Sequence, residues 1–262
     1  MKNIRLEPSS KYVRALKRGV TVVDSQAAQL LYGAFRYPYY VFPIVDIHGE
    51  ILFDQYEDKP NNWVGSIRQT ALKVGDQLLN NAVGIYDNAD IGTADLKGLV
   101  AIRWESMDTW YEEAEEVFVH PHDPYHRLDV LRSSREIQVK IEDLVIAETT
   151  RPVMLIETGL PVRWYIPKDN VRLDLLEPNN TQTSCAYKGF AKYYSARIDG
   201  KLIPDVAWYY DSPFRDALPV AGHVCFFSER FDVTIDGQVQ PKTQTAWAKQ
   251  TPSQATSDPI DG

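Results

Sequence analysis

The chain has 262 residues, of which 44% are hydrophobic, and a formal net charge of −8. This length fits one large domain or two ordinary ones, and the hydrophobic content excludes a wholly disordered chain. The acidic balance argues against nucleic acid as a partner, because binding a polyphosphate needs a surplus of Lys and Arg.

The first residues, MKNIRLEPSSKYVR, are polar and lack the apolar core of a signal peptide. No run along the chain is apolar for long enough to cross a membrane. We therefore expect a cytoplasmic protein without a membrane partner.

A repeat with an offset of 124 residues (133 minus 9) organises the sequence. Ser9-Ser10-Lys11 matches Ser133-Ser134-Arg135, and the same ungapped offset still pairs Asp108 with Asp232. Other identities at this offset are turn formers or apolar residues: Leu31 with Leu155, Pro43 with Pro167, Gly65 with Gly189, and Gly98 with Gly222. Such positions are what a common fold retains, so we predict two domains of one kind, residues 1–109 and 133–237.

In chain order, repeat 1 follows the pattern of repeat 2 up to residue 53, whereas residues 66–79 fit either a strand or a short helix. The segment 110–132 is too apolar and aromatic for a flexible linker, so we predict an ordered connector. Residues 238–262 are rich in Gln, Thr, Ser and Pro, which predicts a disordered tail with Trp247 as its one candidate anchor.

Repeat 2 has the pattern of a β domain. Alternating or short apolar runs predict strands at 136–141, 144–147, 152–157, 163–166, 171–175, 193–198, 206–210 and 222–227. Asp199-Gly200 is a typical hairpin turn pair. Turn signals recur every eight to twelve residues, which predicts an all-β sandwich or barrel-like domain with little helix.

The two repeats differ in the side chains that can carry chemistry. The offset places residues of repeat 2 opposite less reactive ones: Glu157 opposite Gly33, Arg163 opposite Tyr39, Arg172 opposite His48, Cys185 opposite Asn61, Lys188 opposite Val64, and Trp208 opposite Gly84. Repeat 1 thus keeps the frame of the fold and lacks these groups. We expect any pocket to lie in repeat 2, although unequal drift between the copies would give the same contrast.

The segment Cys185-Ala186-Tyr187-Lys188-Gly189 offers two kinds of chemistry. A cation near a thiol lowers its pKa and activates it as a nucleophile, which makes Cys185 a weak catalytic candidate. Lys188 can instead hold an anionic group that Gly189 allows the backbone to approach. A buried thiol beside a surface lysine is the plainer interpretation.

Further candidates surround this segment. Glu157, Arg163 and Arg172 supply a carboxylate and two guanidiniums, which suit either bidentate recognition of a ligand or internal salt bridges. Tyr187, Tyr194 and Trp208 are expected to form pocket walls, because Tyr and Trp combine an apolar ring with a polar group.

The segment His120-Pro121-His122-Asp123, followed by His126, raises the question of a metal site. Its prolines predict a turn-rich loop, and one such cluster seldom fills a metal site alone. We therefore expect no bound metal, and the sequence gives no basis for a cofactor.

Several long motifs resemble the tandem form of the bacterial and fungal family catalogued as domain of unknown function 427. They are Trp110-Tyr111-Glu112-Glu113, Glu116-Val117-Phe118-Val119-His120-Pro121, Asp123-Pro124-Tyr125, Arg127-Leu128-Asp129-Val130-Leu131, Glu157-Thr158-Gly159-Leu160-Pro161, Leu175-Leu176-Glu177-Pro178, Cys185-Ala186-Tyr187-Lys188-Gly189 and Ala207-Trp208. The resemblance implies two tandem domains of the β-tent type, similar in outline to methionine sulfoxide reductase B, but without the zinc-binding cysteine pairs of that group. Repeat 1 departs from the family pattern at Asn61, Trp63 and Val64.

These observations favour a cytoplasmic small-molecule-binding protein, with or without an enzymatic step, whose one pocket in repeat 2 accepts a polar or anionic ligand. The alternative is a non-enzymatic interaction module that uses repeat 1 and the segment 109–132.

Overall fold

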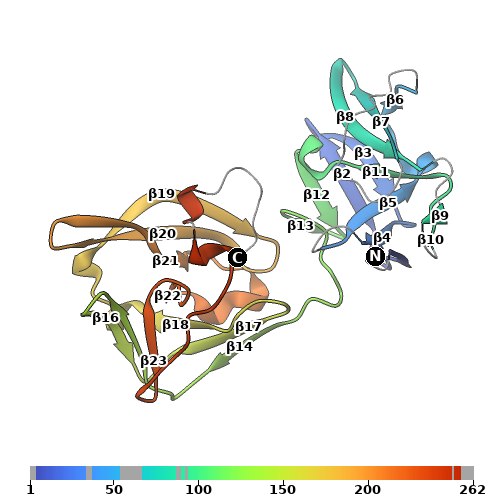
Figure 1. Ribbon diagram of the computed structural model, residues 1–262. Helices are drawn as coiled ribbons and strands as arrows, with labels where there is room; N and C mark the ends of the chain where they lie inside the picture. The colour runs from blue at the N-terminus through green and yellow to red at the C-terminus, as the bar shows by residue number, and fades with distance from the viewer. Residues whose placement is uncertain are drawn as a thin grey trace. The chain divides into compact units, whose positions relative to one another are not determined.

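The computed structural model describes residues 4–33, 37–53, 67–86, 90–91, 94–249 and 251–254. The chain divides into two compact units, Met1–Asp123 and Pro124–Gly262, each built from antiparallel sheets (Figure 1). No helix in the described part of the chain has the length and apolar character needed to span a membrane.

The first unit contains one larger and one smaller antiparallel sheet. The seven-stranded sheet has the order β1 (Arg5–Pro8), β4 (Gln29–Tyr32), β5 (Tyr39–Pro43), β11 (Leu99–Ile102), β8 (Gln77–Ile85), β7 (Arg68–Val74) and β6 (Glu50–Ile51). The four-stranded sheet has the order β13 (Glu115–Val117), β12 (Thr109–Glu112), β2 (Val13–Lys17) and β3 (Val20–Ser25). The short strands β9 (Asp90–Ile91) and β10 (Ala94–Asp95) pair with each other, and η1 (Ile44–Asp46) and η2 (Trp104–Ser106) are 3-10 turns.

The second unit repeats this plan with longer strands. Its seven-stranded sheet runs β14 (Leu128–Arg132), β17 (Val153–Glu157), β18 (Arg163–Pro167), β22 (His223–Phe226), β21 (Lys201–Tyr210), β20 (Gly189–Ile198) and β19 (Leu176–Cys185). Its four-stranded sheet runs β16 (Leu144–Thr149), β15 (Ile137–Ile141), β23 (Asp232–Ile235) and β24 (Gln238–Val239). Five 3-10 segments complete it: η3 (Lys168–Asn170), η4 (Leu173–Leu175), η5 (Arg215–Val220), η6 (Ala246–Ala248) and η7 (Pro252–Gln254).

Strand order and strand irregularities agree between the units at the offset of 124 residues. Register shifts occur at equivalent places in both: Ala15/Leu16 with Val139/Lys140, and Thr70/Leu72 with Tyr194/Ala196. A β-bulge re-aims side chains and tends to be kept with the fold. The prediction of a mainly β chain with two tandem domains of one kind is confirmed.

The structure divides the segment expected as a connector, 110–132, between the units. Strand β12 pairs with β2, and Trp110 is buried against Phe42 and stacks on Trp104. Strand β14, by contrast, pairs with β17 of the second unit. The segment is apolar because it contains strands that complete a sheet in each unit.

Three local expectations also change. Residues 68–74 form the strand β7, which decides between the two alternatives for that segment, while residue 66 lies outside the described residues. The segment 171–175 holds an isolated bridge at Val171 and the turn η4 in place of a full strand. Val171 and Leu175 pack against the core, but Leu173 between them is exposed. The tail is ordered over 238–249 and 251–254, since Trp247 is buried.

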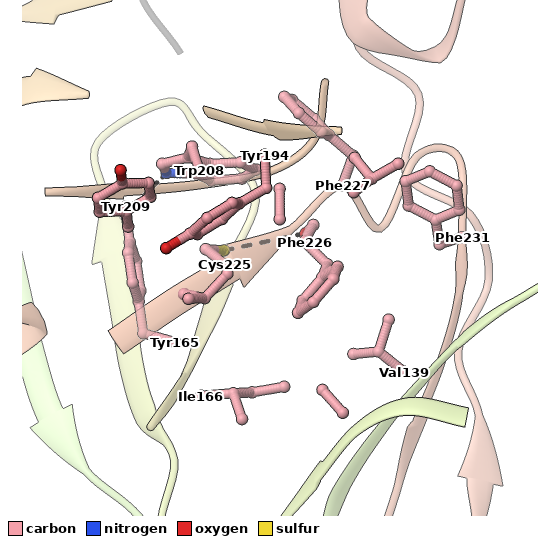
Figure 2. Close-up of a cluster of buried hydrophobic side chains, with 14 of the residues drawn as sticks. Val139, Tyr165, Ile166, Tyr194, Trp208, Tyr209, Cys225, Phe226, Phe227 and Phe231 are labelled. Carbon is pink, nitrogen blue, oxygen red and sulfur yellow. Dashed lines mark hydrogen bonds between the residues drawn. The ribbon is translucent and has the colours of Figure 1, made fainter. Parts of the chain in front are cut away.

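The core of the second unit is rich in aromatic side chains (Figure 2). Trp208 packs against Phe227 with ring centroids 4.5 Å apart, and its ring meets Tyr165 edge-on. Phe227 in turn contacts Trp247, 6.2 Å away between centroids. Because successive residues of a strand point to opposite faces, β17, β18, β20 and β21 each send alternate side chains into this core. Polar side chains at inward positions must therefore find partners there.

Candidate functional site

A small cavity lies among these inward-facing side chains of the second unit. It is lined by residues from β17, β18, β19, β20 and β21, together with Phe227 and Trp247. Five of the predicted site residues line it: Glu157, Arg163, Cys185, Lys188 and Trp208. The cavity has a volume of about 30 Å³, which is room for roughly two water molecules. A larger ligand therefore requires movement of a wall residue.

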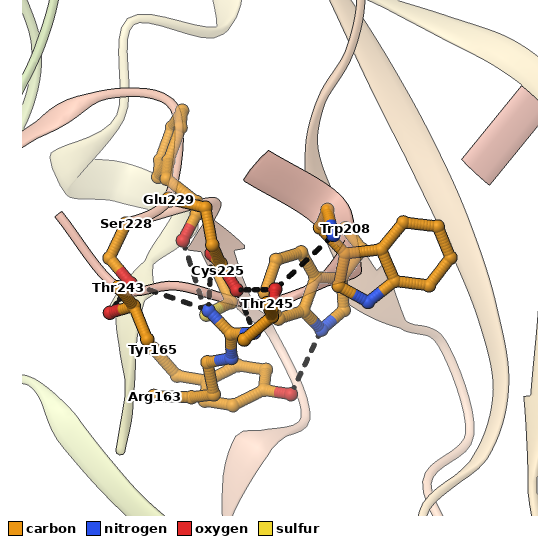
Figure 3. Close-up of polar contacts among 10 residues, drawn as sticks. Arg163, Tyr165, Trp208, Cys225, Ser228, Glu229, Thr243 and Thr245 are labelled. Atoms are coloured by element: carbon orange, nitrogen blue, oxygen red, sulfur yellow. Dashed lines mark hydrogen bonds and ion pairs between the residues drawn. The ribbon is translucent and has the colours of Figure 1, made fainter. Parts of the chain in front are cut away.

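Arg163, which lines the cavity, belongs to a buried bidentate ion pair (Figure 3). Arg163 donates from its two terminal nitrogens to the two carboxylate oxygens of Glu229, at 2.8 and 2.7 Å. The Arg163 guanidinium also lies over the Trp208 ring, 5.2 Å from its centroid. Burial by itself would raise the pKa of Glu229, but the hydrogen bonds and charge of Arg163 outweigh it and lower that pKa. Both groups are therefore charged at neutral pH.

A second ion pair faces the cavity from β17. Lys188 donates to one oxygen of Glu157, and the ring of His126 lies 3.1 Å from the other oxygen. Burial opposes ionisation of Glu157, yet His126 and Lys188 together lower its pKa. The His126 ring stacks on Tyr187, with centroids 3.9 Å apart. Tyr187 therefore helps to hold His126 against Glu157.

The C-terminal segment closes the cavity. Trp247 lines it directly, and Thr245 donates to Glu229 at 2.7 Å. Further along, the backbone N–H of Ser253 donates to the buried Asp205 carboxylate at 2.9 Å. Burial would raise the pKa of Asp205, but hydrogen bonds led by that from Ser253 lower it. The segment is thus anchored on both sides of Trp247, and it shares Glu229 with Arg163.

Three predicted residues do not line the cavity: Tyr187, which stacks on His126, and Arg172 and Tyr194. Arg172 is exposed and forms a salt bridge with Asp174, because it lies between the turns η3 and η4. Tyr194 follows the cavity residue Tyr193 on β20 and therefore points to the opposite face, where it stacks on Tyr209.

Sequence reasoning missed the wall residues Thr183, Tyr193 and Trp247, and it missed Glu229, the partner of Arg163. Glu229 is the most informative of them, because the equivalent residue of repeat 1, Glu105, is also a glutamate. In the first unit Glu105 is exposed, whereas Glu229 is buried. Identity at a repeat position hid a difference in environment. Asn61 and Val64, opposite Cys185 and Lys188, lie outside the described residues.

Cys185 has the environment of an inert thiol. It is buried, and burial raises its pKa, while the nearby Lys188 lowers it only in part because Glu157 opposes that charge. A thiol is a nucleophile only as thiolate. The geometry therefore does not support the weak catalytic role considered for this residue.

We expect Cys185 to react slowly with iodoacetamide at pH 7 in the folded protein. The reaction should be little faster at about pH 8.5, the pKa of an ordinary cysteine, because the buried thiol stays protonated. Mass spectrometry of each cysteine peptide measures this, with urea-unfolded protein as the reactive reference. Cys225 is the internal control, since burial raises its pKa to about 12. Rapid labelling of Cys185 in folded protein at pH 7 would restore it as a nucleophile.

The histidines of the 120–126 loop have separate roles. His120 contacts the Pro121 carbonyl and stacks on Tyr37, His122 pairs with Glu112, and His126 pairs with Glu157. Within the described ranges, no three His, Cys, Asp or Glu side chains are grouped closely enough to hold a metal ion.

Comparison with known families matches both units. A family model described as domain of unknown function (DUF427) covers residues 5–113 and again residues 129–237. Both ends of the two matches differ by 124, which is the offset found within the sequence. Comparison with curated proteins gives no match.

Proposed function

The chain belongs to the family described as domain of unknown function (DUF427), with two copies of the domain, and we propose that the second copy binds a small polar ligand. The site is the cavity lined by Glu157, Arg163, Lys188 and Trp208. The protein would work in the cytoplasm, where its two free cysteines stay reduced.

The observation that carries this proposal is the meeting of two buried ion pairs at one cavity. Both Arg163–Glu229 and Lys188–Glu157 are almost completely shielded from solvent. A buried ion pair contributes little net stability, because desolvation of the charges offsets their attraction. Apolar residues can often replace such a pair without loss of stability. Two such pairs around a cavity, both absent from equivalent positions Gly33 and Tyr39 of repeat 1, are better explained by a ligand than by the fold.

The charges also narrow the ligand class. Each cation at the cavity is already balanced by a carboxylate, so an anion would meet no net positive charge there. A ligand with both donor and acceptor groups and no net charge, neutral or zwitterionic, suits these walls better. Trp208 supplies an apolar face for it, and Trp247 must swing aside to admit it because the closed cavity is so small.

A thermal-shift screen of neutral and zwitterionic metabolites tests the proposal. A ligand that binds only the folded state stabilises it by mass action and so raises the midpoint of thermal unfolding. At a ligand concentration of a hundred times Kd, the free energy of unfolding rises by about 2.7 kcal/mol. Trp208→Phe keeps an aromatic wall but removes the indole N–H that donates to Tyr165 at 3.1 Å, and it should reduce the shift.

Arg172→Ala is the matched control, since Arg172 is a predicted residue that lies away from the cavity. The shift should survive this substitution. A ligand shift that is equal in wild type and Trp208→Phe but lost in Arg172→Ala would place the site elsewhere.

A further inference from the structure

A second concavity in the second unit shares no lining residue with the cavity. It has a volume of about 450 Å³, within the range of roughly 300–1,000 Å³ that ligand pockets occupy. We call it the basic groove. It lies between the end of β15, the start of β21 and the segments around Arg230 and Lys242, and its charged residues are Lys140, Glu142, Lys201, Arg230, Asp232 and Lys242.

The basic groove is positive on an acidic chain. Four cationic and two acidic side chains give it a net charge of +2, against −8 for the whole sequence. The first repeat has none of the cations at the positions equivalent to Lys140, Lys201 and Arg230, which are Leu16, Gln77 and Ser106. The fold therefore does not require these cations, since the first unit forms the same sheets without them.

Arg230 is held in a fixed position at the groove. Its terminal nitrogens donate to the backbone carbonyls of Asp205, at 2.6 Å, and Pro204, at 2.9 Å. The guanidinium also lies 4.9 Å from the centroid of the Phe231 ring. In the described part of the chain it forms no salt bridge, and two of its five N–H donors are enough for these carbonyls. A preoriented guanidinium with spare donors is suited to bind an oxyanion.

The lysines of the groove are available to a ligand. Lys201 lies 3.5 Å from Glu142, and Lys242 lies 3.1 Å from Asp232, but all four side chains are at least about half exposed. Exposed pairs of this kind are worth about 1 kcal/mol at most and exchange readily. Lys140 of β15 is paired with Asp232 of β23 in the sheet. Lys140 therefore adds a third lysine charge to the groove.

We propose that the basic groove binds a small organic phosphate monoester. Such a phosphate carries close to two negative charges at neutral pH, which matches the charge of the groove, and Arg binds phosphate oxygens through paired N–H groups. The organic part lies along the apolar floor of Ile203 and Phe231. This site is independent of the proposed cavity ligand.

Isothermal titration of the full chain with phenyl phosphate at low salt tests the site. Arg230→Gln should weaken binding about tenfold or more, because a hydrogen bond to a charged group is lost. The double variant Lys140→Gln/Lys201→Gln should weaken it several-fold and reduce its dependence on salt. Arg172→Gln, an equal charge change on an exposed residue outside the groove, should leave the affinity unchanged.

The results separate the parts of the proposal. If Arg230→Gln loses its folded circular dichroism spectrum, the lysine double variant carries the test by itself. Wild-type protein that does not bind phenyl phosphate, or a double variant that binds it as well as wild type, overturns the site. Inorganic phosphate binding as tightly as phenyl phosphate overturns the organic part. None of these outcomes bears on the cavity ligand, because that screen uses compounds without net charge and the variant Trp208→Phe.

Discussion

Glu229→Ala will lower the free energy of unfolding of the second unit by about 3–5 kcal/mol, because it leaves the Arg163 charge buried without its partner. Both carboxylate oxygens of Glu229 accept hydrogen bonds from Arg163, and one of them also accepts from Thr245. The substitution therefore strands a guanidinium in the core and releases the segment that carries Trp247. Denaturant unfolding, followed by tryptophan fluorescence, measures the loss.

The repeat supplies a matched control. Glu105→Ala makes the same change at the equivalent position of the first unit, where the side chain is exposed, and should alter stability by no more than about 0.5 kcal/mol. The double variant Arg163→Met/Glu229→Leu should recover most of the loss, since an apolar pair can replace a buried ion pair. A cost below about 1 kcal/mol for Glu229→Ala would show that the pair is solvated, and the argument for a functional cavity would lose its basis.

The repeat made much of the fold and part of the site predictable. Turn formers and apolar residues at one offset gave the two domains, because a fold conserves the positions that shape its backbone and core. The contrast between the copies selected six residues, of which all but Arg172 line the cavity: Glu157, Arg163, Cys185, Lys188 and Trp208. Glu157, Arg163 and Trp208 lie at inward positions of strands, and Lys188 lies in the turn after β19, where its side chain is buried. A polar group at such a position is costly unless it is partnered.

The partners themselves were beyond sequence reasoning. Glu229 lies 66 residues after Arg163, and Lys188 lies 31 residues after Glu157, so only the folded sheets bring them together. The expectation of a polar or anionic ligand counted Arg163 without its partner Glu229, and it did not pair Lys188 with Glu157. The tail was misjudged for a related reason. Its composition predicts disorder, but the burial of Trp247 and the hydrogen bonds from the Thr245 hydroxyl and the Ser253 backbone N–H offset the loss of chain entropy locally.

Lys188→Met will destabilise the second unit by about 3–5 kcal/mol at neutral pH, and the loss will shrink as the pH falls. In the wild type, the pKa of Glu157 is lowered, so its ionisation contributes stability above the unfolded pKa of about 4.3, and this is lost as the pH drops through the folded value. Without Lys188, burial dominates and raises the pKa of Glu157. The carboxyl then favours folding only when protonated, and the cost of the substitution falls in acid.

Unfolding of wild type and Lys188→Met between pH 7 and about pH 4 measures this difference. Lys192→Met is the matched control, since Lys192 pairs with Asp211 at the surface with both side chains about half exposed; its cost should stay within about 0.5 kcal/mol across the range. If the Lys188→Met loss were the same at both ends of the range, it would reflect packing of the lysine stem. The charge of Glu157, and with it the polar character of the cavity wall, would then not depend on Lys188.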